Sequence, residues 1–384
     1  MKAFRVSKND IFVLSPLFFL SFLFCMNFSA VVVQVKELQS LINIIEYGCY
    51  SVLMFSIVLS KKYKIRELMF VFAMILLGLI VKANTGYGWV LFIALIVFST
   101  KKVSFSKICK AIFGGFLLSL MLVVFMYVLG ISDSGLQRRG YSGFGFSHPN
   151  NFSEISMFIY FLQVYMKNKI KKLVFFTALI LGIFTFIVLG NRSASILLIL
   201  YPLLLVALEG IYKKKNNKRF RLIKNVLVMA FPICQIFSIV TALLYSKFAI
   251  IQQLSLVLNS RIFEAFYNLN YFGYSLFGTT TNFTEYTYDP TRNLYFQYNV
   301  LDNSYIGVLI EMGTIAAVIW GVIHVINAKK MDRNMEVELI AIYILSSLFG
   351  LMESSFRIIF VDFTLTYFLS THTNLNSIVN VAEE

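Results

Sequence analysis

Long apolar runs separated by short polar connections dominate the chain. A bilayer is crossed by about 20 apolar residues in a helix, and backbone groups in hydrocarbon need internal hydrogen-bond partners, so runs too long for strands predict helices. We place the runs at 11–33, 41–60, 67–81, 87–99, 108–130, 152–166, 173–190, 193–209, 225–246, 304–327, 336–350 and 355–371. The pattern predicts an all-α polytopic membrane bundle of about 12 transmembrane helices, a single domain over residues 1–384.

Composition agrees with lipid as the main solvent. Of the 384 residues, 58% are hydrophobic and only 14% are charged, and the mean hydropathy is +0.76, which is more apolar surface than a water-facing protein can bury. The four cysteines stand singly within apolar runs, without metal-ligand spacing, so we expect them to serve packing. They are Cys25, Cys49, Cys109 and Cys234.

The net charge of +15 would suggest nucleic acid in a soluble protein, but the positions of the cations exclude it. When alternate connections are assigned to the two membrane sides, 25 of the 34 Lys and Arg fall on one side. The positive-inside rule makes that side cytoplasmic. Both termini are then predicted to be cytoplasmic, and the basic segment 1–10 precedes an uncleaved first span, since the run at 11–33 exceeds a signal-peptide core.

The densest basic run is KKKNNKRFRLIK, Lys213 to Lys224. Such a run can bind nucleic acid or lipid headgroups. We interpret it as a topology signal that keeps this connection in the cytoplasm.

Two predicted outer connections are long, at 131–150 and 247–303, and outer loops of a helical bundle are where function concentrates. Within the second, the segment from Phe248 to Phe277 keeps helical apolar spacing, which predicts a helix lying along the membrane surface. The tyrosines of this loop fit a sugar site and an ordinary interfacial belt equally well. They are Tyr271, Tyr274, Tyr286, Tyr288, Tyr295 and Tyr298.

Several arginines fall on the predicted outer side, where topology disfavours them. They are Arg138, Arg139, Arg192, Arg261, Arg292 and Arg357. Arg192, in GNRSAS between two apolar runs, lies close to the membrane boundary, where a guanidinium needs a partner or water. Its planar fork suits phosphate or carboxylate. The alternatives are a snorkelling side chain at a helix end and a pair with a structural acid such as Glu353.

Three further positions could carry chemistry, each with a structural alternative. Arg261 has Glu264 three residues later on the same helical face, which also fits a simple ion pair. His148 in GFSHPNN could transfer a proton near neutral pH or be a surface polar residue, with Pro149 starting the next helix. Asp302 in LDNSYIGVLIEMG could act as a base or as the N-cap of the following helix.

Motifs of soluble enzymes are missing from the sequence. There is no P-loop, Gly143-Phe144-Gly145 lacks the strand and helix of a dinucleotide fold, and three histidines are too scattered for a zinc site. We therefore expect no metal and no cofactor.

The order of a GFSHPN loop, an NRSA turn, an RIF…SLFG segment and an LDNSYIGVLIEMG helix start resembles bacterial O-antigen and capsular polysaccharide polymerases of the Wzy type, within the polymerase and ligase superfamily. The resemblance covers residues 85 to 370. It implies a metal-independent glycosyltransferase of the bacterial cytoplasmic membrane that joins polyprenyl-diphosphate-linked oligosaccharide repeat units on the outer side. Such a lipid-linked unit would be both donor and acceptor, with membrane lipid and a chain-length regulator protein as further partners and no nucleic acid.

Residue by residue, the resemblance implies that Arg192 and Arg261 bind the diphosphate. The Asp302-Asn303 pair aligns with a motif in which related ligases have His, and this departure favours a polymerase over a ligase while leaving the base open. Candidates for that base are Asp302, His148 and Glu154. The remaining substrate-binding candidates are Arg138, Arg139, Arg292, Asn303, Glu154 and Glu264.

Two other functions fit the pattern. Transporters also commonly have about 12 transmembrane helices, so a flippase for the same lipid-linked sugars is an alternative. A ligase that transfers finished polymer to an acceptor is another. The clustering of charge in outer loops, rather than at mid-membrane depth, favours the polymerase.

Overall fold

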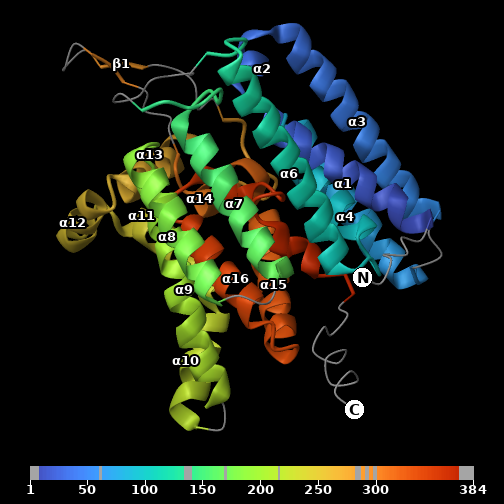
Figure 1. Ribbon diagram of the computed structural model, residues 1–384. Coiled ribbons are helices and arrows are strands. Elements are labelled where there is room, and N and C mark those ends of the chain that lie inside the picture. Colours follow the sequence, from blue (N-terminus) through green and yellow to red (C-terminus); the bar gives the residue numbers. More distant parts are fainter. Residues whose placement is uncertain are drawn as a thin grey trace.

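A computed structural model gives the fold of residues 8–59, 63–133, 141–167, 171–214, 217–281, 287–289, 294–296 and 301–371, which are the residues that the structure describes. Helices dominate it (Figure 1). The first half contains α1 (Lys8–Met26), α2 (Ala30–Gln34), α3 (Lys36–Leu59), α4 (Ile65–Thr85), α5 (Trp89–Ser99), α6 (Phe105–Val128), α7 (Pro149–Lys167), α8 (Lys171–Ile187) and α9 (Arg192–Lys213).

The second half contains α10 (Lys218–Val228), α11 (Ala230–Leu244), α12 (Ala249–Val257), α13 (Arg261–Phe272), α14 (Ser304–Gly307), the π-turn η1 (Val308–Met312), α15 (Gly313–Arg333), α16 (Val337–Phe349) and the 3-10 turns η2 (Ser354–Arg357) and η3 (Phe363–Tyr367). The strands β1 (Thr287–Asp289) and β2 (Leu294–Phe296) pair antiparallel as a short hairpin.

Five of the described helices are long and apolar enough to cross a membrane, and a sixth is added if the bent pair α10 and α11 is one span. The five are α3, α4, α6, α9 and the unit Ser304–Arg333 that contains α14, η1 and α15. The helices α1, α5, α8 and α16 are apolar but shorter. The predicted helical bundle is therefore confirmed in its described part, and five or six apolar helices are long enough to cross a membrane, fewer than the twelve spans expected.

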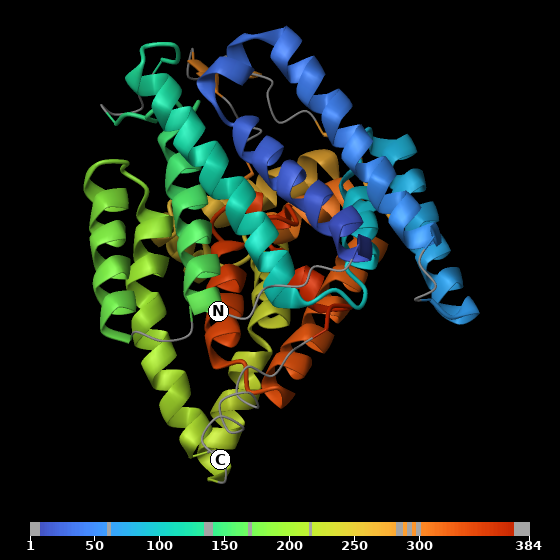
Figure 2. The ribbon, with the colours of Figure 1, turned by 45° about the vertical axis from the view of Figure 1, so that its right-hand side comes forward.

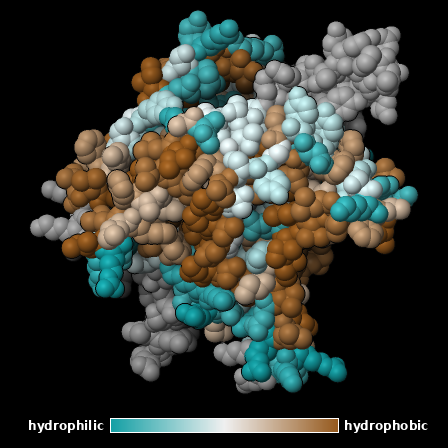
Figure 3. Space-filling view, turned by 180° about the vertical axis from the view of Figure 1, so that it is seen from behind, coloured by the Kyte–Doolittle hydropathy of each residue, from teal (hydrophilic) through white to brown (hydrophobic). Residues whose placement is uncertain are grey.

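Exposed apolar side chains cover the outside of the helices. Ile180, Leu203 and Val206 are 67%, 55% and 66% exposed. On the face in Figure 3, hydrophobic residues occupy much of the middle, and hydrophilic residues gather toward the upper and lower ends. This distribution is unfavourable in water and is the one expected for helices that face lipid.

Inside the bundle, small residues allow backbones to approach closely. A Cβ at Gly115 of α6 would lie 2.1 Å from the Ser21 hydroxyl oxygen and 2.4 Å from the Phe18 carbonyl oxygen of α1. Only glycine therefore permits this helix pair, as is common where helices pack in lipid by van der Waals contact. The four cysteines are all buried and free, which confirms their predicted packing role.

Contacts between distant segments define two ends of the bundle. At one end, which we call the basic end, α1 and α6 begin side by side, with Lys107 Nζ 2.7 Å from Asp10 Oδ2. Lys330 near the end of α15 donates to the carbonyl oxygens of Tyr367, Phe368 and Ser370 at the same place. The helices α7, α9, α13 and α14 begin at the opposite end.

The apolar run 355–371 is not a helical span, and this prediction was wrong. After η2 it continues as irregular chain and the turn η3, and Phe105 N–H donates to the Thr371 carbonyl at the basic end. Most of its side chains are buried, including Phe356, Phe363 and Tyr367. Non-helical backbone is tolerated at membrane depth only where protein encloses it, and here the surrounding helices do so.

A buried polar network holds this segment. Asp362 Oδ2 accepts from Trp320 Nε1 at 3.0 Å and lies 2.8 Å from His324 Nε2, while Asp362 Oδ1 accepts from the Thr364 hydroxyl at 2.8 Å. Phe231 stacks on the His324 ring with centroids 3.7 Å apart. The sequence pattern does not reveal this network, because His324 lies within an otherwise apolar run of α15.

We expect Asp362→Ala to destabilise the protein by about 2–5 kcal/mol, because three buried donors lose their acceptor. A lower apparent melting temperature of the detergent-purified protein would show it. Asp133→Ala, at an exposed position, is the matched control and should melt like the parent. An unchanged melting temperature for Asp362→Ala would mean that the network does not hold the segment.

Candidate functional site

Arg261 opens α13 after a sharp break in the chain. The preceding helix α12 ends at Val257, and Asn259 and Ser260 both have positive φ, 54° and 66°. The Ser255 hydroxyl accepts from Phe263 N–H at 3.0 Å, which fixes the start of α13. The segment expected to be one surface-lying helix is thus two helices, and the break between them sets the direction of Arg261.

The Arg261 guanidinium bridges two segments that are distant in the sequence. Nη1 lies 2.5 Å from Asp302 Oδ2, just before α14, and Nη2 lies 3.3 Å from Glu353 Oε1, just after α16. The three side chains are 15%, 34% and 8% exposed, in the order Arg261, Asp302 and Glu353. A fork that reaches two carboxylates needs the planar geometry of arginine.

Further polar groups surround this pair. The Ser193 hydroxyl at the start of α9 is hydrogen-bonded to Glu353, and the Ser304 hydroxyl donates to the Glu353 carbonyl at 2.6 Å. Glu154 in the first turns of α7 accepts from the Ser355 hydroxyl at 2.6 Å. We call Glu154, Ser193, Arg261, Asp302, Glu353 and Ser355 the Arg261 cluster. Its members come from the starts of α7, α9 and α13 and from the chain beside α14 and η2.

Carboxylates outnumber the cation in the cluster. Burial raises the pKa of Glu353, while Arg261 and the Ser193 hydrogen bond oppose the increase. Glu264, one turn after Arg261, has a buried Oε2 without a hydrogen-bond partner among the described residues. Burial raises its pKa to about 7, with Arg261 opposing and Glu353 adding to the increase. Glu264 can therefore hold a proton beside this cluster near neutral pH.

Stability should fall as pH rises toward 8 because of Glu264. Its folded pKa of about 7 exceeds the ordinary 4.5 of an unfolded glutamate, so the folded state binds the proton more tightly. That stabilisation is complete below the unfolded pKa and is lost as pH rises through the folded one. Glu264→Gln should therefore melt at a higher temperature than the parent at pH of about 8, and with a shallower pH dependence.

Thermal melts of the purified protein across this pH range would measure the effect. Glu37→Gln, at an exposed carboxyl in α3, should keep the slope of the parent. The same slope in Glu264→Gln would show that Glu264 is not protonated in the folded protein.

Arg192 is the first residue of α9, whose N-cap Asn191 accepts from Ala194 N–H at 2.9 Å. Its side chain is exposed, and no ion pair holds it among the residues that the structure describes. The suggested pair of Arg192 with Glu353 is therefore not formed, because Glu353 contacts Arg261 and Ser193 instead. Arg192 remains an unneutralised cation one residue from the cluster.

Asp302 and Asn303 divide the roles expected of the helix start. Asn303 is the N-cap of α14, its side chain accepting from Ile306 N–H at 3.1 Å and donating to the Ser238 hydroxyl at 3.1 Å. Interpreting Asp302 as the N-cap was wrong by one residue. Asp302 instead forms an ion pair with Arg261. The suggested Arg261–Glu264 pair is therefore replaced by the pairs of Arg261 with Asp302 and Glu353.

His148 immediately precedes α7, which begins at Pro149 as predicted. Its Nδ1 accepts a hydrogen bond from Asn150 N–H at 3.1 Å, so the imidazole caps one of the free backbone N–H groups at the start of the helix. No contact connects His148 directly to Arg261 in the structure as described. Arg138, Arg139 and Arg292 lie outside the described residues, as do Tyr286 and Tyr298.

Another outer arginine of the sequence has a separate partner. Arg357 Nη1 lies 2.6 Å from Glu311 Oε2, and this glutamate is 1% exposed. A Cβ at Gly307 would lie 2.7 Å from the same nitrogen, so glycine makes room for the pair. The pair connects η2 to η1 and has no contact with Arg261 among the described residues.

Sequence reasoning did not identify Glu353, Ser355 and Ser193 as members of the site. Glu353 was considered only as a structural partner for Arg192. An acid immediately after an apolar helix on the outer side is the one signal that could have identified it, because a carboxylate at that boundary also needs a partner.

The guanidinium and carboxylate groups of this site can bind an anion and accept a proton. Within the ranges described, no group of three or more His, Cys, Asp or Glu side chains is placed to hold a metal ion. Guanidinium groups can stabilise charge that develops on an anionic leaving group, and the neighbouring carboxylates can accept a proton. Comparisons with protein-family models, with curated proteins and with solved structures found no match.

Proposed function

We propose that this protein is a membrane glycosyltransferase that polymerises polyprenyl-diphosphate-linked oligosaccharide repeat units into surface polysaccharide. The observation that carries the proposal is the Arg261 cluster. Arginine, aspartate and glutamates from segments up to 201 residues apart meet at one end of an apolar helical bundle. Charged groups at such a boundary cost free energy to desolvate, and their convergence is therefore an indication of a functional site.

The proposed chemistry divides between cation and carboxylate. The acceptor hydroxyl attacks the anomeric carbon of the donor, a new glycosidic bond forms, and the bond from that carbon to the diphosphate oxygen breaks. The polyprenyl diphosphate leaves with the electron pair, and the hydroxyl proton passes to a carboxylate. Fixed guanidinium groups stabilise the growing negative charge on the diphosphate.

Exposure suggests which residue takes each role. Arg192 is exposed and unneutralised, so it is the cation available to the diphosphate. Asp302 is 34% exposed against 8% for Glu353, and it is therefore the carboxylate of the two that an acceptor hydroxyl can reach. Arg261 orients Asp302 through the 2.5 Å contact and adds positive charge beside the reacting atoms.

The finer topology belongs to the same proposal. In this proposal the chain crosses the membrane in eleven helical passages, with the non-helical segment 358–371 as a twelfth. The basic end then lies in the cytoplasm of a bacterium and the Arg261 cluster lies outside. A cysteine at exposed Asn217 should react with an impermeant label only from the cytoplasm, and one at exposed Thr280 only from outside. The opposite labelling would place the cluster inside the cell and exclude the proposal.

The test of function is the fate of lipid-linked sugar in a strain that lacks the gene. Single repeat units accumulating on the outer leaflet, with loss of long polymer, would support polymerisation. Single units retained on the inner leaflet would show a flippase instead. Long polymer persisting on its carrier lipid would show a ligase, and either of the last two results overturns the proposal.

A further inference from the structure

The short helix α10 presents a basic face at the basic end of the bundle. It follows α9 as the lower tip of the molecule in Figures 1 and 2, and it is bent by 59° from α11. Its first turns carry three exposed cations and no acid, namely Lys218, Arg219 and Arg221.

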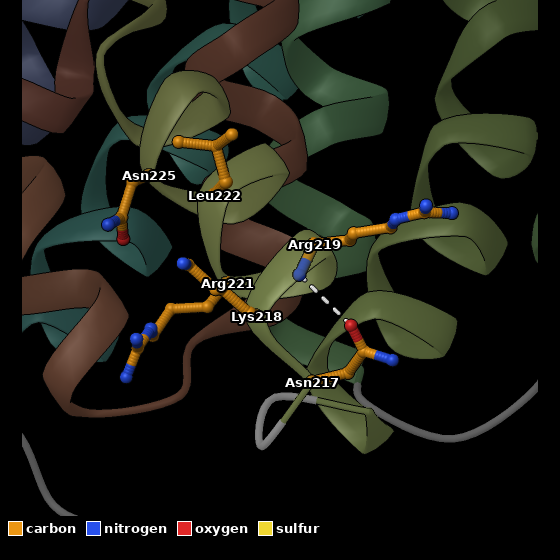
Figure 4. A pocket seen from close by; sticks show the side chains of 6 residues that line it. All are labelled: Asn217, Lys218, Arg219, Arg221, Leu222 and Asn225. Carbon is orange, nitrogen blue, oxygen red and sulfur yellow. Dashed lines mark hydrogen bonds between the residues drawn. The ribbon is translucent and has the colours of Figure 1, made fainter.

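The spacing of these residues separates two faces. Lys218, Arg221 and Asn225 stand at positions i, i+3 and i+7, so they share one side of the helix. Figure 4 shows Arg221 and Asn225 on the same side, with Arg219 extending the other way. The apolar side chains Leu222 and Val226 are 66% and 52% exposed beside them.

Contacts with the bundle hold α10 in this orientation. Lys224 Nζ lies 2.8 Å from Asp332 Oδ2, and Asp332 Oδ1 also accepts from the Tyr212 hydroxyl at 2.6 Å. One basic residue of the helix is thus neutralised against α9 and α15. Lys218 and Arg221 have no such carboxylate partner among the residues described, and their face stays open.

A hollow of about 740 Å³ lies beside the first turns of α10 (Figure 4). It is lined by Asn217, Lys218, Arg219, Arg221, Leu222 and Asn225. Cations, amides and one exposed leucine therefore surround the same space. That combination suits a ligand with a phosphate at one end and hydrocarbon at the other, and the volume is within the range of small-molecule sites.

The depth of the hollow indicates which leaflet it meets. The 22 residues of α9 span about 33 Å at 1.5 Å per residue, close to the hydrocarbon thickness of a bilayer. Because α9 begins beside the Arg261 cluster, its end at Lys213 reaches the headgroup region of the other leaflet. Lys218 and Arg221, which follow soon after, lie at headgroup depth, and Leu222 and Val226 lie toward the acyl chains.

We propose that the face of α10 formed by Lys218, Arg221, Leu222 and Asn225 is a binding site for an anionic glycerophospholipid of the leaflet at the basic end. The phosphate is held by Lys218 and Arg221, and the glycerol oxygens accept from the Asn225 amide. The first acyl carbons contact Leu222. Each cation near anionic headgroups strengthens association by about fivefold, so two of them give a clear preference over zwitterionic lipid.

A tryptophan reporter would test this site in the full-length protein. Leu222→Trp is reconstituted in phosphatidylcholine vesicles that contain brominated phosphatidylglycerol or, separately, brominated phosphatidylcholine. The same protein without the reporter corrects for Trp89 and Trp320. We expect brominated phosphatidylglycerol to quench the reporter with an association constant about 25-fold above that of the brominated phosphatidylcholine, the product of the two cations' contributions.

Charge-matched variants separate the site from general bilayer charge. Lys218→Gln with Arg221→Gln should abolish the preference, whereas Lys329→Gln with Arg333→Gln, two exposed cations at the same end, should leave it unchanged. The proposal is overturned by equal quenching by both lipids, by a preference that survives the first pair, or by an equal loss in the control pair. Relief of quenching by millimolar inorganic phosphate would show a site for soluble anions and would overturn it too.

Discussion

Replacing Arg261 with alanine should reduce the formation of long polymer by at least about 100-fold, the cost of losing a preorganised charge in a transition state. The reason is double. In the proposed mechanism the leaving diphosphate loses a neighbouring cation, and Asp302 loses the contact at 2.5 Å with Arg261 that orients it. Arg261→Lys keeps the charge but not the fork, so we expect it to retain only a small part of the activity. Polymer length on gels, normalised to folded protein, measures both.

Loss of folding must be separated from loss of chemistry, because Arg261→Ala leaves Glu353 buried without its cation. Adding Glu353→Gln removes that uncompensated charge, so the double variant should recover stability while polymer stays absent. Arg357→Lys, which removes the guanidinium from the separate pair with Glu311, is the matched control and should polymerise normally. Full-length polymer from stable Arg261→Ala protein would remove Arg261 from the proposed mechanism.

Arg192→Ala should weaken polymerisation by about 10- to 100-fold without lowering stability. The contrast with Arg261 follows from exposure, because Arg192 has no described ion pair to lose and its guanidinium is available to substrate. The measurement is initial polymerisation rate against concentration of purified lipid-linked repeat unit, with melting temperature in parallel. We expect the effect to include an increase in KM, since in the proposed mechanism Arg192 binds the diphosphate before it leaves.

Arg333→Ala, an exposed arginine at the basic end, provides the control and should show parental kinetics. A normal rate for Arg192→Ala would leave the diphosphate without its proposed contact. A fall in stability equal to the fall in rate would instead indicate that Arg192 supports the start of α9. These outcomes are distinct from those of Arg261, whose role combines structure with chemistry.

Local sequence identified Arg192, Arg261 and Asp302 as two cations and an acid at a predicted membrane boundary, where a charged group needs a partner or water. It did not identify Glu353 as the second partner of Arg261, because 92 residues separate them and no periodicity connects them. The assignment of the N-cap to Asp302 rather than Asn303 has the same origin. Both side chains can cap a helix, and only the position of Arg261 decides that Asp302 forms the ion pair while Asn303 caps α14.

The sequence by itself indicated that lipid surrounds the protein and that its architecture is a helical bundle. Apolar runs, together with the uneven distribution of 34 Lys and Arg, specify helices in lipid because hydrocarbon leaves the backbone few alternatives. The tertiary structure alone decided that the run 355–371 passes through the bundle without a helix, since its backbone is shielded by neighbours and its Asp362 is held by Trp320 and His324. It also decided which charges meet, because ion pairs between distant segments depend on packing that no local pattern encodes.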